Sequence, residues 1–186
     1  MKKYLRDYLF LFAGSGIIIA IDQWTKALVR ANIPENTSWV PWDWLAPYAR
    51  ILHVSNTGVA FGMFKGIGWL FAVFAVLVIL AILFYFPRVD RKDLTLRIAM
   101  CLQMAGAAGN LIDRILQNGR VTDFVSIGNF AIWNVADASI TLGVVVLLIG
   151  LWLQERKSKA DAGKIETANT DKPVEQPQED GETQNE

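Results

Sequence analysis

The run IGWLFAVFAVLVILAILFYF, residues 67–86, constrains this chain more than any other stretch, because it carries no charged side chain. A helix rises by about 1.5 Å per residue, so a run of this length spans the roughly 30 Å hydrocarbon core of a bilayer. Uncharged runs of this kind indicate transmembrane helices. The sequence therefore predicts a membrane protein, with residues 67–86 as one of its crossings.

Three other apolar segments predict further crossings, at about 8–28, 94–114 and 131–153. A chain that is 53% hydrophobic is too apolar for an ordinary soluble domain. The first segment could instead be a cleaved signal peptide, because basic residues precede it, but no convincing small-x-small cleavage site comes before Asp22. We expect an all-α membrane protein whose four transmembrane helices form one domain, residues 1–159.

The distribution of Lys and Arg predicts which end of the bundle faces the cytoplasm. One side of the predicted membrane holds ten such residues: Lys2, Lys3, Arg6, Arg88, Arg91, Lys92, Arg97, Arg156, Lys157 and Lys159. The other side holds six: Lys26, Arg30, Arg50, Lys65, Arg114 and Arg120. This bias places both termini in the cytoplasm.

Residues 160–186 differ from the rest of the chain in composition. Acidic and small polar residues dominate this tail, and large apolar residues are almost absent. Such a segment buries too little apolar surface to offset the entropy of ordering. The sequence therefore predicts a disordered, acidic, cytoplasmic tail.

Carboxylates are rare inside transmembrane helices and usually mark a functional site. By helical rise, Asp22 lies about 21 Å up the first segment and Asp113 about 24 Å up the third. Asp137 lies about 8 Å below the outer face in the fourth. All three reach the outer layer of the membrane, which predicts one shared polar site.

Helical spacing groups other polar residues with these carboxylates. Asn110, Asp113 and Arg114 follow an i, i+3, i+4 pattern on one helix face, and Asn134 precedes Asp137 by three residues. Asp22 and Lys26 are four apart and can form an ion pair that anchors the first segment at the membrane interface. Asp113 with Arg114 could also be only the interfacial end of the third segment.

The outer loops predict extended structure. Residues 32–66 contain four Trp and Tyr residues suited to an interfacial belt, followed by RILHVSNTGVAFG, which is typical of a strand and a turn. GRVTDF, residues 119–124, is a second extended piece that delivers Asp123 just before the fourth segment. Asp123 and Asp137 are therefore candidates to meet.

Two neighbouring carboxyl groups at low dielectric do not both ionise easily, so one keeps a proton while the other is anionic. Such a pair can activate water and polarise an amide carbonyl, as in aspartic proteases. The sequence has few residues for a Ser-His-Asp triad or a zinc site, since His53 is the only histidine and Cys101 the only cysteine. A Ser-Lys pair is conceivable but no motif supports it. We expect no metal and no cofactor.

Five motifs in order carry a family resemblance: DQWTK (22–26), NTGVAFG (56–62), GNLIDR (109–114), VTDFV (121–125) and NVADASI (134–140). With them, residues 8 to about 153 resemble lipoprotein signal peptidase, the signal peptidase II family. The resemblance implies an aspartic endopeptidase of the bacterial inner membrane. It would cleave the signal peptide from prolipoproteins just before a cysteine that carries diacylglycerol. It also implies a small extracytoplasmic β-cradle and an interfacial helix within residues 32–66.

The resemblance implies roles for individual residues. Asp123 and Asp137 match the catalytic pair, near the outer face of the membrane. Four residues match positions that line the site, hold the substrate backbone or orient the aspartates: Asn56, Asn110, Arg114 and Asn134. Asp22 and Lys26 match a motif important mainly for stability, and Asp113 is taken as a structural polar residue. The expected partners are lipidated prolipoproteins and membrane lipid, with no nucleic acid, and the protein is expected to act as a monomer.

Two other functions remain open at this point. A small transporter or proton-relay subunit could use Asp22, Asp113 and Asp137 to carry ions, although the inner half of the membrane would lack a relay. A lipid-binding structural protein is the second alternative. Cleavage of a diacylated prolipoprotein by the purified protein would distinguish all three.

Overall fold

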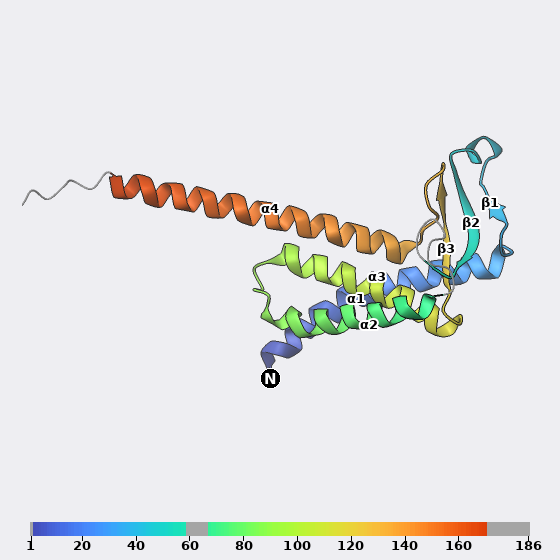
Figure 1. Ribbon diagram of the computed structural model, residues 1–186, viewed down its shortest axis with the longest axis horizontal. Coiled ribbons are helices and arrows are strands. Elements are labelled where there is room, and N and C mark those ends of the chain that lie inside the picture. The colour runs from blue at the N-terminus through green and yellow to red at the C-terminus, as the bar shows by residue number, and fades with distance from the viewer. Residues whose placement is uncertain (1, 59–66, 171–186) are drawn as a thin grey trace, which may run out of the picture. The chain divides into compact units, whose positions relative to one another are not determined.

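The computed structural model describes residues 2–58 and 67–170. The elements in chain order are α1 (Lys2–Asn32), β1 (Ser38–Trp39), the 3₁₀ helix η1 (Asp43–Leu45), β2 (Ala49–Asn56), α2 (Gly68–Tyr85), the 3₁₀ helix η3 (Phe86–Arg88), α3 (Leu94–Leu116), β3 (Val121–Ile127) and α4 (Val135–Thr170) (Figure 1). The chain divides into two compact units, residues 1–150 and 151–186. The sheet and the packed helices described below belong to the first unit.

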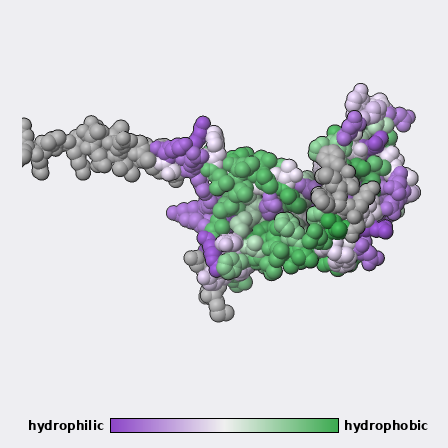
Figure 2. Space-filling view, in the orientation of Figure 1, coloured by the Kyte–Doolittle hydropathy of each residue, from purple (hydrophilic) through white to green (hydrophobic). Residues whose placement is uncertain are grey.

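Among the described residues, three helices are long and apolar enough to cross a membrane, within Tyr4–Asn32, Gly68–Arg88 and Val135–Arg156. Their outward faces carry large apolar side chains, and Figure 2 shows apolar residues gathered over the helices between polar ends. The described part of α3 does not meet the same measure of apolarity. It carries Arg97, Asp113 and Arg114, so the predicted third crossing, 94–114, is a helix of more polar composition than the other three.

Helix α3 lies against α1 and α2 and buries ten of its 23 residues. The apolar core of the helices consists of Leu11, Ile82, Phe86, Cys101 and Met104. Cys101, the one cysteine of the chain, is thus a small buried hydrophobic residue.

Glycines allow α4 to approach α3 closely. A side chain on Gly106 of α3 would collide with the backbone carbonyl of Ala136 and with Ser139 and Ile140 of α4. Further along, a Cβ on Gly143 would lie 3.1 Å from Gln103. Gln103 also donates from Nε2 to the Ile140 carbonyl at 3.1 Å. Small residues that let helix backbones approach are the usual means of packing helices in membranes.

The sheet has the strand order β1-β2-β3 and is antiparallel throughout. Strand β2 pairs with β3 so that Asn56 lies opposite Val121, and the register shifts between Ile51 and Val54. The sequence predicted the two extended pieces separately and put the cradle within residues 32–66. The structure joins them, so the cradle takes its third strand from outside that range, and residues 59–66 lie outside the described part of the chain.

After β3 the chain turns back and pairs with itself. Val125 and Trp133 form an isolated antiparallel bridge, in which Val125 N donates to the Trp133 carbonyl at 2.8 Å and Trp133 N donates to the Val125 carbonyl at 3.1 Å. We call this pair the clasp. It closes the connection between β3 and α4 two residues beyond Asp123 and one residue before Asn134.

Helix α4 is longer than the predicted span. It starts at Val135 and not at residue 131, and it continues to Thr170. Residues 160–170 are therefore helical, where the sequence predicted disorder from residue 160. The segment from Glu155 is rich in Ala, Lys and Glu, which favour helices without needing a packed face. The rest of the predicted tail, residues 171–186, lies outside the described residues.

Candidate active site

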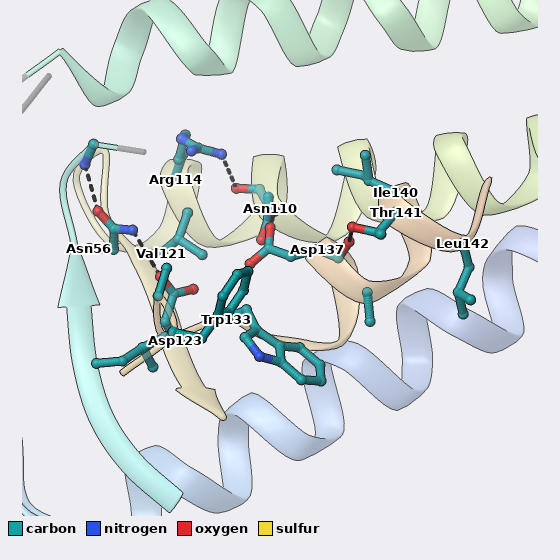
Figure 3. Close-up of a pocket in the computed structure, with 15 residues that line it drawn as sticks. Asn56, Asn110, Arg114, Val121, Asp123, Trp133, Asp137, Ile140, Thr141 and Leu142 are labelled. Carbon is teal, nitrogen blue, oxygen red and sulfur yellow. Dashed lines mark hydrogen bonds between the residues drawn. The ribbon is translucent and has the colours of Figure 1, made fainter. Parts of the chain in front are cut away.

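A cavity of about 680 Å³ opens where the end of β2, strand β3, helix α3 and the start of α4 meet (Figure 3). Its lining residues are Asn56, Gly58, Asn110, Arg114, Val121, Asp123, Phe130, Ala131, Ile132, Trp133, Asp137, Ala138, Ile140, Thr141 and Leu142. Both aspartates proposed as a pair from the sequence line this one cavity. Most of the remaining wall is apolar, so a small polar centre lies in a hydrophobic pocket.

Asp137 lies in the first turn of α4, nearer to the helix start than the sequence predicted. Asn134 Oδ1 accepts from Asp137 N at 3.0 Å, and Asp137 Oδ2 accepts from Asn134 N at 3.2 Å. This reciprocal pattern is that of a capping box, with Asn and Asp in place of the usual Ser or Thr and Glu. Asn134 and Asp137 therefore start the helix and belong to the site at the same time.

Asp123 projects from β3, a strand in which all of the first four side chains are buried. Both of its carboxylate oxygens accept hydrogen bonds from amide side chains. Asn56 Nδ2 donates to Oδ2 at 2.8 Å, and Asn134 Nδ2 donates to Oδ1 at 2.6 Å. Burial, together with the negative charge of Asp137, raises the pKa of Asp123 to about 7.

Asparagine amides connect the two carboxyl groups. Asn134 bonds to both aspartates, through Nδ2 to Asp123 and through its backbone N and Oδ1 to Asp137. Asn110 Nδ2 donates to Asp137 Oδ1 at 2.8 Å, and Asn110 Oδ1 accepts from Asn134 Nδ2 at 3.2 Å. Each carboxyl group thus has a fixed amide donor and a fixed orientation toward the cavity.

Arg114 lines the cavity one helical turn after Asn110. Its Nη1 donates to the Asn110 carbonyl at 3.3 Å, while its Nε is buried with no hydrogen-bond partner among the described residues. A buried, unpartnered guanidinium N–H is costly unless a ligand satisfies it. Arg114 can therefore offer a donor to a carbonyl group that enters the cavity.

Asp22 and Lys26 form the predicted ion pair, with Lys26 Nζ 2.9 Å from Asp22 Oδ2. Both side chains are fully buried between the helices, and the place of the pair at the membrane interface stays a prediction. Asp113 is also buried and lies 3.3 Å from Lys26 Nζ through Oδ2, so it is not an interfacial surface charge.

Asp22 and Asp113, the two carboxylates beside Lys26, also accept hydrogen bonds from backbone N–H groups of neighbouring elements. Asp113 Oδ2 accepts from Thr122 N at 2.9 Å, next to Asp123 in β3. Asp22 Oδ1 accepts from Ala136 N at 2.9 Å, in the first turn of α4. These contacts hold β3 and α4 to α1 and α3, and sequence spacing gave no sign of them.

No three His, Cys, Asp or Glu side chains converge as a metal site requires, within residues 2–58 and 67–170. The carboxyl groups of the site aspartates accept hydrogen bonds from amide groups. A metal ion would instead be held by several carboxylate, imidazole or thiolate groups together.

The chain matches known proteins over the segment that contains this site. The family model described as signal peptidase (SPase) II matches residues 15–153. The chain belongs to the signal peptidase II family. A lipoprotein signal peptidase of Dehalococcoides mccartyi is 40% identical over 145 residues, which are 76% of this chain and 88% of that protein. One of Halalkalibacterium halodurans is 36% identical over 152 residues, 78% of this chain and 93% of that protein.

A solved structure, described as a bacterial membrane enzyme determined by the in meso method at 2.3 Å resolution, is similar to this signal peptidase II with a TM-score of 0.72. The identity is 28%, and the likeness covers 80% of this chain and 90% of the other. Membership in the signal peptidase II family supports a membrane protease that cleaves lipoprotein signal peptides.

Proposed function

We propose that this signal peptidase II is an aspartic endopeptidase in which Asp123 and Asp137 are the catalytic pair. The observation that carries the proposal is that both carboxyl groups line one apolar-walled cavity and are joined by the same side chain, Asn134. Their orientation is fixed before any substrate enters. Preorganised polar groups at low dielectric are worth more to a reaction than the same groups in water.

The chemistry follows from one shared proton. The ionised carboxylate accepts a proton from a water molecule as the water oxygen attacks the carbonyl carbon of the scissile peptide bond. The protonated carboxyl group donates to the carbonyl oxygen, and the guanidinium of Arg114, which lines the same cavity, is a further donor. The tetrahedral intermediate then collapses: the C–N bond breaks, the leaving nitrogen takes a proton from the pair, and one hydroxyl of the intermediate returns its proton to the pair as the new carboxyl group forms. The two carboxyl groups end with one proton, as they began.

The apolar wall fits the proposed substrate, a prolipoprotein cut just before a cysteine that carries diacylglycerol. Phe130, Ile132, Trp133 and Leu142 give that wall large hydrophobic side chains, which suit an apolar signal peptide or an acyl chain. The proposal includes a monomer that needs no cofactor.

For the membrane arrangement we propose four crossings in the bacterial inner membrane, by α1, α2, α3 and α4, with both termini in the cytoplasm. The polar residues of α3 are buried against α1 and α4 and do not face lipid, so they do not prevent a crossing. The sheet and the cavity then lie near the outer face, where the Lys and Arg count is lower.

Purified protein in detergent, given a synthetic prolipoprotein peptide with a diacylglyceryl cysteine, tests this function. We expect cleavage on the amino side of that cysteine, and little cleavage of the same peptide without lipid. Mass spectrometry of the products gives the cut site. Absence of cleavage by folded protein, together with proton flux in vesicles, would favour the transporter alternative.

Arg114→Lys is expected to reduce kcat/KM by roughly tenfold or more, because an ammonium group does not reproduce the planar guanidinium fork. The charge stays in place, so the variant separates geometry from electrostatics. Steady-state cleavage per folded molecule is the measurement. Wild-type rates would assign Arg114 a role in membrane topology only.

Cleavage should fall as pH rises through about 7, because Asp123 has a pKa of about 7 and loses its proton there. The sign follows from the chemistry: the pair needs one proton, and above this pH both groups become anionic. The profile of kcat/KM between pH 5 and 9 would show it. A flat profile across that range would contradict the shared proton.

Truncation after Lys159 should leave folding and cleavage nearly intact. Every residue removed belongs to the second unit, 151–186, so the contacts within residues 1–150 are kept. Thermal unfolding in detergent and cleavage rate are the measurements. A large loss of activity in a well-folded truncated protein would show that the tail takes part in cleavage.

A further inference from the structure

Lys26 is a fully buried cation beside the site, and the proposed mechanism does not use it. Its ammonium group has three N–H donors and three close acceptors from three side chains: Asp22 Oδ2 at 2.9 Å, Asp113 Oδ2 at 3.3 Å and Asn110 Oδ1 at 3.0 Å. The first two contacts are ion pairs within the helix bundle. The third leads directly to Asp137.

The contact with Lys26 fixes how the amide of Asn110 is turned. An ammonium group donates and never accepts, so the Asn110 atom that faces Lys26 must be the oxygen. The same oxygen accepts from Asn134 Nδ2. The amide nitrogen of Asn110 then points the other way and donates to Asp137 Oδ1 at 2.8 Å. Without Lys26, a flipped Asn110 would present its oxygen to the carboxylate.

The charges around the site also depend on Lys26. We use the name polar layer for the charged groups that face one another from α1, α3, β3 and α4. Among the described residues these are Asp22, Asp113, Asp123, Asp137, Lys26, Arg30 and Arg114. Four carboxyl groups face three basic groups, so the layer is neutral when one carboxyl group carries one proton. Buried charge that is not balanced is costly, so this state is favoured.

We infer that Lys26 is a positioning residue for the reaction, which turns Asn110 toward Asp137 and holds the Asp123–Asp137 pair at one proton. This inference rests on the proposed aspartic mechanism. Removal of Lys26 leaves one negative charge too many, so the layer takes up a second proton. A doubly protonated pair has no base to activate water, and the enzyme then needs a higher pH to lose that proton.

The test measures kcat and kcat/KM against pH for Lys26→Met, Asp113→Asn and the double variant, on the lipidated peptide and per folded molecule. In Asp113→Asn the Asn oxygen can keep the bond from Thr122 N, while the amide nitrogen replaces the oxygen that faces Gln23 and Arg30. Arg97→Met is the matched control. Arg97 is a buried cation of α3 that lies 3.1 Å from Asp7, about 20 Å along the helix from Asn110.

The charge argument predicts shifts of opposite sign. Lys26→Met should move the acidic limb of the profile up by about one pH unit, the size expected for loss of a nearby opposite charge. Asp113→Asn should move it down, and the double variant should return it toward wild type. For Lys26→Met we also expect kcat to fall roughly tenfold or more, because misplaced reacting groups are slow. Arg97→Met should lower thermal stability and leave the profile unshifted.

Each outcome decides the inference. An unshifted profile in Lys26→Met, with only lower stability, would overturn it and leave Lys26 as a structural residue. If Lys26→Met does not fold, Asp113→Asn decides alone, and the absence of a downward shift overturns the inference. Failure of the proposed aspartic mechanism would give a different result from failure of this inference, because Asp123→Asn and Asp137→Asn would then retain turnover.

Discussion

Asp123→Asn and Asp137→Asn are each expected to reduce cleavage to background, by roughly 10⁴-fold or more in kcat, the scale on which loss of a catalytic residue acts in other proteases. An amide has nearly the shape of a carboxylate, but it can neither accept the proton of the attacking water nor share one. Both oxygens of each aspartate accept hydrogen bonds, so Asn must place its NH₂ group against a donor. A cost of about 1–3 kcal/mol in stability accompanies the loss.

Turnover per folded molecule on the lipidated peptide is therefore the required measurement. Asp43→Asn is the matched control, since Asp43 is an exposed carboxylate in η1 and should retain wild-type rates. Residues that act as a unit are strongly non-additive, so the double variant of Asp123 and Asp137 should be no slower than either single variant. Substantial turnover in either single variant would show that Asp123 and Asp137 are not a catalytic pair.

Gly106→Val is expected to prevent α3 and α4 from packing, and with it to abolish both folding and cleavage. A Cβ at Gly106 would meet the Ala136 carbonyl oxygen, which is backbone, and would lie 2.7 Å from Ser139 Oγ. Overpacking costs roughly 1–3 kcal/mol when side chains can adjust, and a backbone atom cannot. Because Ala136 is adjacent to Asp137, separation of the helices also displaces the site.

Gly16→Val controls for the change from glycine to a β-branched residue in a helix. Gly16 lies in α1, and a Cβ there would meet nothing within 4 Å. The yield of monodisperse protein and its thermal unfolding in detergent compare the two variants. Equal behaviour of Gly106→Val and Gly16→Val would show that α3 and α4 do not need close contact.

Much of the membrane architecture could be predicted from the sequence, because apolar runs have few alternatives. The span predicted at 67–86 and helix α2, Gly68–Tyr85, differ by one residue at each end. Helical rise also placed Asp22, Asp113 and Asp137 in one layer. In the structure Asp22 and Asp113 contact Lys26, and Asn110 links Lys26 to Asp137. The chemical role of Asp123 and Asp137 stays a prediction.

The start of α4 was predicted too early, since apolar residues at 131–133 look like the helix that follows them. The spacing of Asn134 and Asp137 was the available signal, because an Asn followed three residues later by an acid can start a helix. The burial of Lys26 had no comparable signal. An i, i+4 ion pair has the same sequence pattern whether it lies among lipid headgroups or between helices. Only the further contact of Lys26 with Asn110 shows that this pair lies between helices.

The clasp between Val125 and Trp133 separates two parts of the active site. Asp123 and Asp137 lie outside the loop that it closes, whereas Phe130, Ala131 and Ile132 of the cavity wall lie within it. A loop closed at its base can change in length and sequence without moving the segments that it joins. Insertions near Gly128 would therefore reshape the pocket while the carboxyl groups keep their positions, so substrate range can diverge among relatives while the reaction stays the same.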